Sequence, residues 1–221
     1  MIGITLTGAD QRTKVDDLVR LADMGAEIGI LYTWSPDGRN RYPSLSWIIE
    51  TAEALCGRSA IHICGQRARA EVIYSYPGSA GIGFALECVR RFQVNGKLSP
   101  LNVRTICHSF PDHVVITQDA AYNRVLRDMD CPNHALLVDA SGGRGLLPQH
   151  WTRPATTKSV GFAGGLGPET LRDELPKIAQ AAQGDWWIDM EGRLRDEDDW
   201  FDIERARSAL TVFQTYLGGK P

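Results

Sequence analysis

The sequence lacks the features that define several large classes of protein. Its longest apolar runs fall well short of the roughly 20 residues that a helix needs to cross a bilayer. The N-terminal stretch MIGITLTG has no basic region and no cleavage site, so it is unlike a secretion signal. The net charge of −3 gives no support for binding to nucleic acid or to an anionic membrane. We therefore expect a cytoplasmic protein whose partners include neither nucleic acid nor a membrane.

Patterns typical of disulfides and metal sites are also missing. No C-x-x-C pair occurs, and the odd number and wide scatter of the cysteines are more typical of reduced thiols in a cytosolic protein than of a disulfide framework. The histidines show no metal-ligand spacing. The cysteines are Cys56, Cys64, Cys88, Cys107 and Cys131, and the histidines are His62, His108, His113, His134 and His150. We expect no metal and no cofactor.

What the sequence does contain is a regular alternation of strand-like and helix-like runs. Eight strand-like runs begin at Ile2, Ile28, Ala60, Phe92, His113, Ala135, Ser159 and Trp186. Several are continuously apolar, as strands buried on both faces should be. Eight such units, with no stretch that resembles a domain linker, predict an α/β fold: one closed (β/α)8 TIM barrel over residues 1–221. The alternative is an open doubly wound sheet, but its glycine fingerprint is missing after the first strand, which runs into TGADQRT.

One glycine-rich segment, VGFAGGLGPETL over residues 160–171, predicts a turn that binds an anion. Gly164, Gly165 and Gly167 would let backbone N–H groups approach a phosphate closely, and Pro168 suits the first position of a helix. In barrels of this kind a phosphate often lies between the loops after strands seven and eight. The alternative is a tight turn that holds no ligand.

Two stretches predict irregular helices. Residues 66–91 predict a helix, a glycine-rich loop and a second helical piece. Pro176 lies inside the helix expected after the glycine-rich segment. Because proline breaks the interior of a helix, the residues before it predict a separate short helix that ends near Leu175.

Six motifs, in order along the chain, resemble those of phosphoribosylanthranilate isomerase, a barrel enzyme of tryptophan biosynthesis. They are DDLVRLADMGAEIGILY, RNRYPS, FQVNG, LLVDASGGRG followed by Trp151, GFAGGLGPETL, and IDMEG followed by the acidic RDEDD. The resemblance implies an isomerase that opens a small anionic, phosphorylated aminosugar and rearranges it to a ketose, an Amadori rearrangement. It leaves the oligomeric state open, with a homodimer as one alternative.

The resemblance also implies catalytic roles for particular residues. In the family an aspartate protonates the ring oxygen of the sugar, and Asp139 matches it. A cysteine at the end of the first strand removes a proton from carbon, but the family's KICGI falls here on TLTGA, with Thr7 in the cysteine position. The pKa of a threonine hydroxyl is far higher than that of a cysteine thiol. Thr7 therefore cannot replace the thiol as a base. Cys64, at the end of the third strand, and Asp10, in the first loop, are the alternative bases.

Further residues are expected to bind the substrate. Arg41 matches the family arginine that holds the substrate carboxylate, and a guanidinium fork suits that group. Gln93 and Asn95 lie two apart on one strand, so both point into the barrel mouth or neither does. Glu191 stands where the family has a serine, and we expect Arg193 to offset the repulsion between this carboxylate and a phosphate. The expected phosphate-binding residues are Gly143, Gly164, Gly165, Gly167, Gly192 and Arg193.

Two functions from different classes therefore remain open. The first is acid–base isomerisation of a phosphorylated aminosugar. The second is a barrel of the same descent that has lost catalysis and binds a ligand or a partner protein. An ionisable group that faces Asp139 across a cavity would favour catalysis. A phosphosugar aldolase is a weaker alternative, since it would need a strand-end lysine for a Schiff base, and none of the strand-like runs ends with one.

Overall fold

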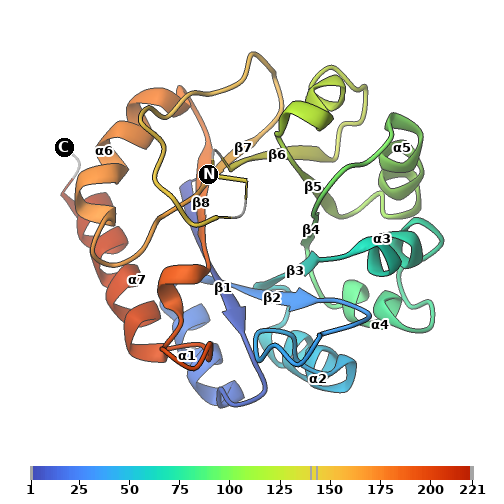
Figure 1. Cartoon of the computed structure of the whole chain (residues 1–221), viewed down its shortest axis with the longest axis horizontal. Coiled ribbons are helices and arrows are strands. Elements are labelled where there is room, and N and C mark those ends of the chain that lie inside the picture. The colour runs from blue at the N-terminus through green and yellow to red at the C-terminus, as the bar shows by residue number, and fades with distance from the viewer. Residues whose placement is uncertain (1, 140, 143, 220–221) are drawn as a thin grey trace.

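The computed structural model describes residues 2–139, 141–142 and 144–219, and its central feature is a closed barrel (Figure 1). Eight parallel strands follow one another around the barrel in chain order, and β8 pairs with β1 to close it. The strands are β1 (Ile2–Ala9), β2 (Glu27–Tyr32), β3 (Ser59–Ile63), β4 (Arg91–Val94), β5 (Val114–Gln118), β6 (His134–Asp139), β7 (Val160–Ala163) and β8 (Trp186–Met190). The predicted (β/α)8 barrel is confirmed.

The helices form a ring outside the strands (Figure 1). They are α1 (Val15–Asp23), α2 (Leu45–Leu55), α3 (Gln66–Ile73), α4 (Ile82–Glu87), α5 (Pro100–Ser109), α6 (Leu171–Ala182) and α7 (Ile203–Gly218), with the 3-10 helices η1 (Ala121–Leu126) and η2 (Gly192–Leu194). The predicted pair of helical pieces within 66–91 is present as α3 and α4. No helix in the described part of the chain is both long and apolar enough to cross a membrane.

The separate short helix expected before Pro176 is wrong, because α6 continues through this proline from Leu171 to Ala182. A proline inside a helix removes one backbone hydrogen bond. Leu171, Leu175 and Ile178 are fully buried on one face of α6. Burial of three such side chains stabilises the continuous helix by several times about 1.5 kcal/mol, which outweighs the loss of one hydrogen bond.

The inside of the barrel is filled towards its amino-terminal end. Arg91 donates from Nε to Glu27 Oε1 at 2.6 Å and from Nη2 to Thr5 Oγ1 at 2.8 Å, and its guanidinium lies 4.6 Å from the ring centre of Trp187. An apolar cluster continues upward inside the barrel, made of Ile116, Ala135, Leu137, Ala163 and Trp187. The space at the centre of the barrel therefore opens at the carboxyl ends of the strands.

Two inward-facing glycines make this filling fit. A Cβ on Gly161 would overlap the indole of Trp187, and a Cβ on Gly29 would overlap the side chain of Thr7. Close packing of this kind leaves no room for an added methyl group. Gly29 therefore leaves the space that the Thr7 side chain occupies.

Lowering the pH is expected to destabilise the protein through His134, at the start of β6. Its imidazole is buried, with Nε2 2.9 Å from Thr117 Oγ1. Burial, and secondarily the charge of Lys158, lowers the pKa of His134 from 6.5 to about 4. Above pH 6.5 the imidazole is neutral in both states. As the pH falls towards 4, the unfolded chain takes up a proton that the folded chain does not. The free energy of unfolding then falls by up to about 3 kcal/mol.

Urea unfolding at about pH 7 and about pH 4.5 measures this loss. His134→Gln removes the titrating group, so its free energy of unfolding should fall less between the two pH values than that of the wild type. An equal fall in both proteins would contradict the assignment to His134.

Candidate functional site

A cavity of about 600 Å³ lies at the carboxyl ends of the strands. Strand ends contribute neutral polar groups, acids and a histidine, and the loops contribute arginines. The polar and charged side chains on its wall are Arg39, Arg41, Tyr42, His62, Cys64, Gln93, Asn95, Gln118, Asp139, Ser141, Arg144, Asp189, Glu191 and Arg193. A cavity in this position is where barrels of this type carry their chemistry.

Asp139 ends β6 and lines this cavity. Its Oδ1 accepts hydrogen bonds from the backbone N–H of Ser141 at 3.0 Å and from the hydroxyl of Ser141 at 2.7 Å. A Cβ on Gly164 would lie only 3.2 Å from the same oxygen. The carboxyl group is therefore held in one orientation, beside the glycine-rich loop.

Asp189 of β8 is a second carboxyl group on the wall of this cavity. Asp139 and Asp189 both pair with Ala163 of β7, so they lie at one level and two strands apart. The spacing between strands puts their backbones roughly 10 Å from each other. Two carboxyl groups from strands on either side of β7 thus share one cavity.

The surroundings of Asp189 hold it tightly. Its Oδ1 accepts a 2.6 Å hydrogen bond from the hydroxyl of Thr7, and its Oδ2 lies 3.8 Å from His62 Nδ1. Burial raises the pKa of Asp189, while His62 and the Thr7 hydroxyl act in the opposite direction. Thr7 is itself buried and is not among the residues that line the cavity. The residue in the family's cysteine position therefore contacts a carboxylate instead of the cavity.

The two alternative bases lie in different settings. Cys64 lines the cavity, where burial raises the pKa of its thiol to about 11. Asp10 is fully buried and is not part of the cavity wall. It accepts a 2.7 Å hydrogen bond from the backbone N–H of Phe201 and pairs with Arg195 at 3.2 Å. At neutral pH the thiol is protonated, and the Asp10 carboxyl is occupied by protein groups.

Arg41 lies on the cavity wall in the connection between β2 and α2, and carboxylates of the protein surround its guanidinium. Nε and Nη2 donate to the two oxygens of Asp199 at 3.1 and 2.6 Å, and Nη1 donates to Glu191 Oε1 at 2.6 Å. Burial raises the pKa of Glu191, and the charge of Arg41 opposes this rise. The arginine expected to hold a substrate carboxylate is thus engaged within the protein.

The glycine-rich loop is only partly open to the cavity. Gly164 and Gly165 line it with φ of +113° and +66°, in the region that favours glycine. A Cβ on Gly165 would overlap the backbone of Leu147, because the β6–β7 connection lies over the loop. The N–H of Gly167 donates to Thr170 Oγ1 at 3.0 Å, and Gly167 does not line the cavity.

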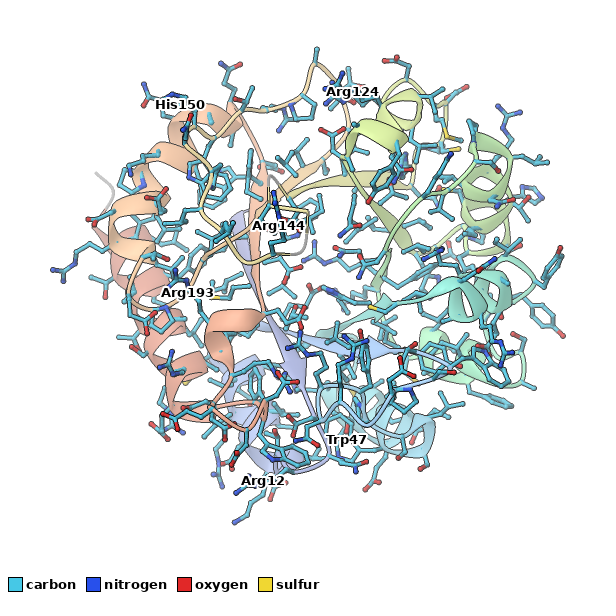
Figure 2. All side chains as sticks on the ribbon, viewed as in Figure 1. Arg12, Trp47, Arg124, Arg144, His150 and Arg193 are labelled. Atoms are coloured by element: carbon cyan, nitrogen blue, oxygen red, sulfur yellow. The ribbon has the colours of Figure 1, made fainter. Side chains whose placement is uncertain are left out.

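The other expected phosphate-binding residues lie nearby or cannot be described. Gly192 and Arg193 line the cavity at the start of η2, and Gly143 lies outside the described residues. Arg144, which sequence reasoning missed, also lines the cavity and donates from Nε to the carbonyl of Ser141 at 2.8 Å. In Figure 2 Arg144 lies beside the central opening, and Arg193 lies further out, towards α6 and α7. Arg144 lies within the DASGGRG motif, directly after a strand-like run, and this position was the available sequence signal for it.

Gln93 and Asn95 both line the cavity, and Gln93 Nε2 donates to Asn95 Oδ1 at 2.7 Å. His62, also missed, precedes Cys64 by two residues and so shares its inward face. In the described part of the chain, no three His, Cys, Asp or Glu side chains come close enough together to hold a metal ion. The site thus offers acids, arginines and neutral hydrogen-bonding groups.

Comparison with known proteins gives one clear result. No protein-family model and no curated protein matches the sequence. Phosphoribosyl anthranilate isomerase from Thermus thermophilus matches the structure with a TM-score of 0.67 at 18% identity, covering 97% of this chain and 99% of that chain. TrpF from Jonesia denitrificans matches with a TM-score of 0.66 at 14% identity, covering all of both chains.

A third structure is a phosphoribosyl anthranilate isomerase in complex with reduced 1-(o-carboxyphenylamino)-1-deoxyribulose 5-phosphate. It matches with a TM-score of 0.64 at 12% identity, covering 97% of this chain and 100% of that chain. The fold is therefore that of the isomerases which the sequence motifs resemble.

Proposed function

We propose that this barrel catalyses the acid–base isomerisation of a small phosphorylated aminosugar, in which an N-glycosylamine becomes a 1-amino-1-deoxyketose. One observation carries the proposal: Asp139 and Asp189 line the same cavity at the carboxyl end of the barrel. This rearrangement needs an acid and a base that reach the same substrate. A barrel that only binds a ligand would not need a second carboxyl group on the cavity wall that holds the first.

The reaction divides into two proton transfers. Asp139 in its protonated form gives its proton to the ring oxygen, the C1–O bond breaks, and the nitrogen lone pair forms a protonated Schiff base. A base then removes the proton on C2, and the C–H electron pair shifts to give a neutral enolamine. Return of a proton to C1, with loss of the proton on the C2 hydroxyl, completes the ketose.

Asp189 is the base in this proposal. Its carboxylate accepts a hydrogen bond from the hydroxyl of Thr7, the residue in the position of the family's cysteine. Cys64 is a weaker candidate because a thiol with a pKa of about 11 is almost wholly protonated at neutral pH. Asp10 is directed away from the cavity by Arg195 and the N–H of Phe201.

The phosphate of the substrate is proposed to lie at the loops after β6, β7 and β8. Gly164, Gly165 and Gly192 bring backbone close to this part of the cavity, and Arg144 and Arg193 supply positive charge. The carboxylate of Glu191, which precedes Gly192, is paired with Arg41.

The test is conversion of N-(5-phosphoribosyl)aniline and N-(5-phosphoribosyl)anthranilate to their ketoses, followed by ¹H NMR. The wild type is expected to accelerate the conversion of at least one of them. Asp139→Asn is expected to slow it by about 10²- to 10⁴-fold with little loss of binding, because the amide can accept the Ser141 hydrogen bonds but gives no acidic proton.

Asp112→Asn is the matched control, since Asp112 is exposed and precedes β5 at the amino-terminal end of the barrel. It should convert as the wild type does. Unchanged conversion in Asp139→Asn would rule out its acid role. If the reduced ketose analogue binds but neither glycosylamine is converted, the barrel binds without catalysis.

A further inference from the structure

The edge of the cavity at Arg41 is built differently from a site for an anion. The guanidinium of Arg41 already binds a carboxylate of the protein. Its Nε and Nη2 donate to the two oxygens of Asp199 in a bidentate pair. The third nitrogen, Nη1, donates to Glu191. All three guanidinium nitrogens therefore already donate to protein carboxylates, whose charge offsets the attraction that Arg41 would exert on an incoming carboxylate.

The ion-pair cluster around Arg41 is acidic as a whole. Asp199 also accepts a 2.8 Å hydrogen bond from Arg195 Nε, and Arg195 in turn pairs with Asp10. Two arginines thus face three carboxyl groups, counting Glu191, which leaves a net charge of −1 when all are ionised. Part of this cluster is buried. The cluster therefore repels the negative charge of an incoming ligand carboxylate more strongly than it would in water.

One further cation lies on this side of the cavity. Arg39 is exposed, and its guanidinium stacks on the ring of Tyr42 with 5.0 Å to the ring centre. Both residues line the cavity. Arg39 is therefore a group that can still attract an anion here, independently of Arg41.

Two more arginines lie near the glycine-rich loop, and both are labelled in Figure 2. Arg144 is on the loop after β6, and Arg193 follows β8, where a Cβ on Gly167 would overlap its side chain. The cavity thus has arginines near the glycine-rich loop for the phosphate, and around Arg41 and Glu191 a part whose charges are already paired within the protein, for the group that the sugar nitrogen carries.

We infer that the site takes phosphorylated N-glycosylamines whose amine substituent carries no negative charge, and that Glu191 accepts a hydrogen bond from a neutral or cationic group on that substituent. The inference deepens the proposed function and rests on it for the class of substrate. It departs from the role that the motif match implies for Arg41, because the charge there is already neutralised by Asp199 and Glu191.

Binding of two stable ligands tests the inference without any catalysis. They are reduced 1-(o-carboxyphenylamino)-1-deoxyribulose 5-phosphate and the same molecule without its carboxylate, reduced 1-(phenylamino)-1-deoxyribulose 5-phosphate. We expect calorimetry to show that the wild type binds the phenyl ligand at least about tenfold more tightly than the carboxyphenyl ligand. Equal or tighter binding of the carboxyphenyl ligand would overturn the inference whatever any variant does.

Freeing Arg41 should reverse the preference. The double variant Glu191→Gln, Asp199→Asn removes both carboxylates from Arg41 and is expected to bind the carboxyphenyl ligand more tightly than the phenyl ligand. Glu197→Gln, Asp198→Asn is the matched control. Both of its residues are exposed, and the net charge changes equally without touching Arg41; it should keep the wild-type preference. Reversal in the control as well would assign the effect to net charge and overturn the inference.

Two other outcomes have distinct meanings. If the wild type prefers the carboxyphenyl ligand and Arg39→Gln abolishes that preference, Arg39 holds the carboxylate and the inference fails, while the proposed isomerisation stands. If neither ligand binds, both the inference and the proposed substrate class are overturned. A phenyl preference together with failed conversion of both glycosylamines supports the inference and removes the proposed catalysis.

Discussion

Asp189→Asn is expected to lower the rate of glycosylamine conversion by about 10²- to 10⁴-fold, because it removes the proposed base. The amide oxygen of the variant can still accept the hydrogen bond from the Thr7 hydroxyl, so the packing around β1 and β8 should persist. The reduced ligands should therefore still bind. In the wild type, kcat/KM should rise with pH as the Asp189 carboxyl loses its proton. Burial raises the pKa of Asp189 above the ordinary 3.8, so this acidic limb lies above pH 3.8.

Thr7→Val tests whether Thr7 acts through Asp189 as a positioning residue. Valine fills the same space without the hydroxyl, so the carboxylate loses its 2.6 Å donor and its pKa rises further. The acidic limb of kcat/KM should therefore move to higher pH, with a smaller loss of rate at high pH than in Asp189→Asn. An Asp189→Asn protein that converts substrate at the wild-type rate would assign the base to another titratable group on the cavity wall, such as His62, Cys64 or Glu191.

The barrel could be predicted from sequence because its signals are local. Buried parallel strands give continuous apolar runs, and each run is recognisable within about five to eight residues. The period of a strand predicted that Gln93 and Asn95 share one face, but the structure was needed to show that this face lines the cavity. The same local reasoning failed at Pro176, where tertiary burial of Leu171 and Leu175 decides the helix.

The charge pairing of the site could not be predicted in this way. Arg41 meets Asp199 across 158 residues, and Thr7 meets Asp189 across 182 residues. Such pairs exist only because the barrel closes β8 onto β1 and brings the chain ends together. A motif match places a residue at a strand end, but it does not say whether a distant side chain has already occupied that residue.

Asp10 illustrates the same lesson, and its replacement is expected to have the largest effect on stability. Asp10→Ala should lower the free energy of unfolding by about 3–5 kcal/mol. Asp10 is fully buried and Arg195 is only 2% exposed on its side chain, so the variant removes one of the two carboxylates that pair with a buried guanidinium and leaves it only the half-buried Asp199. The backbone N–H of Phe201 also loses its 2.7 Å acceptor, which loosens the turn before α7. The measurement is urea unfolding at neutral pH.

Asp23→Ala provides the matched control, because Asp23 pairs with Arg58 at the surface and is 62% exposed on its side chain. Its loss should cost no more than about 1 kcal/mol. If Asp10→Ala does not fold, Asp10→Asn is the second variant; it keeps one acceptor for Phe201 and should be intermediate in stability. A stable Asp10 variant that loses glycosylamine conversion would instead make Asp10 a catalytic base. Lost stability with conversion retained in the folded fraction would identify Asp10 as the residue that anchors Arg195, and through it Asp199 and Arg41, at the mouth of the barrel.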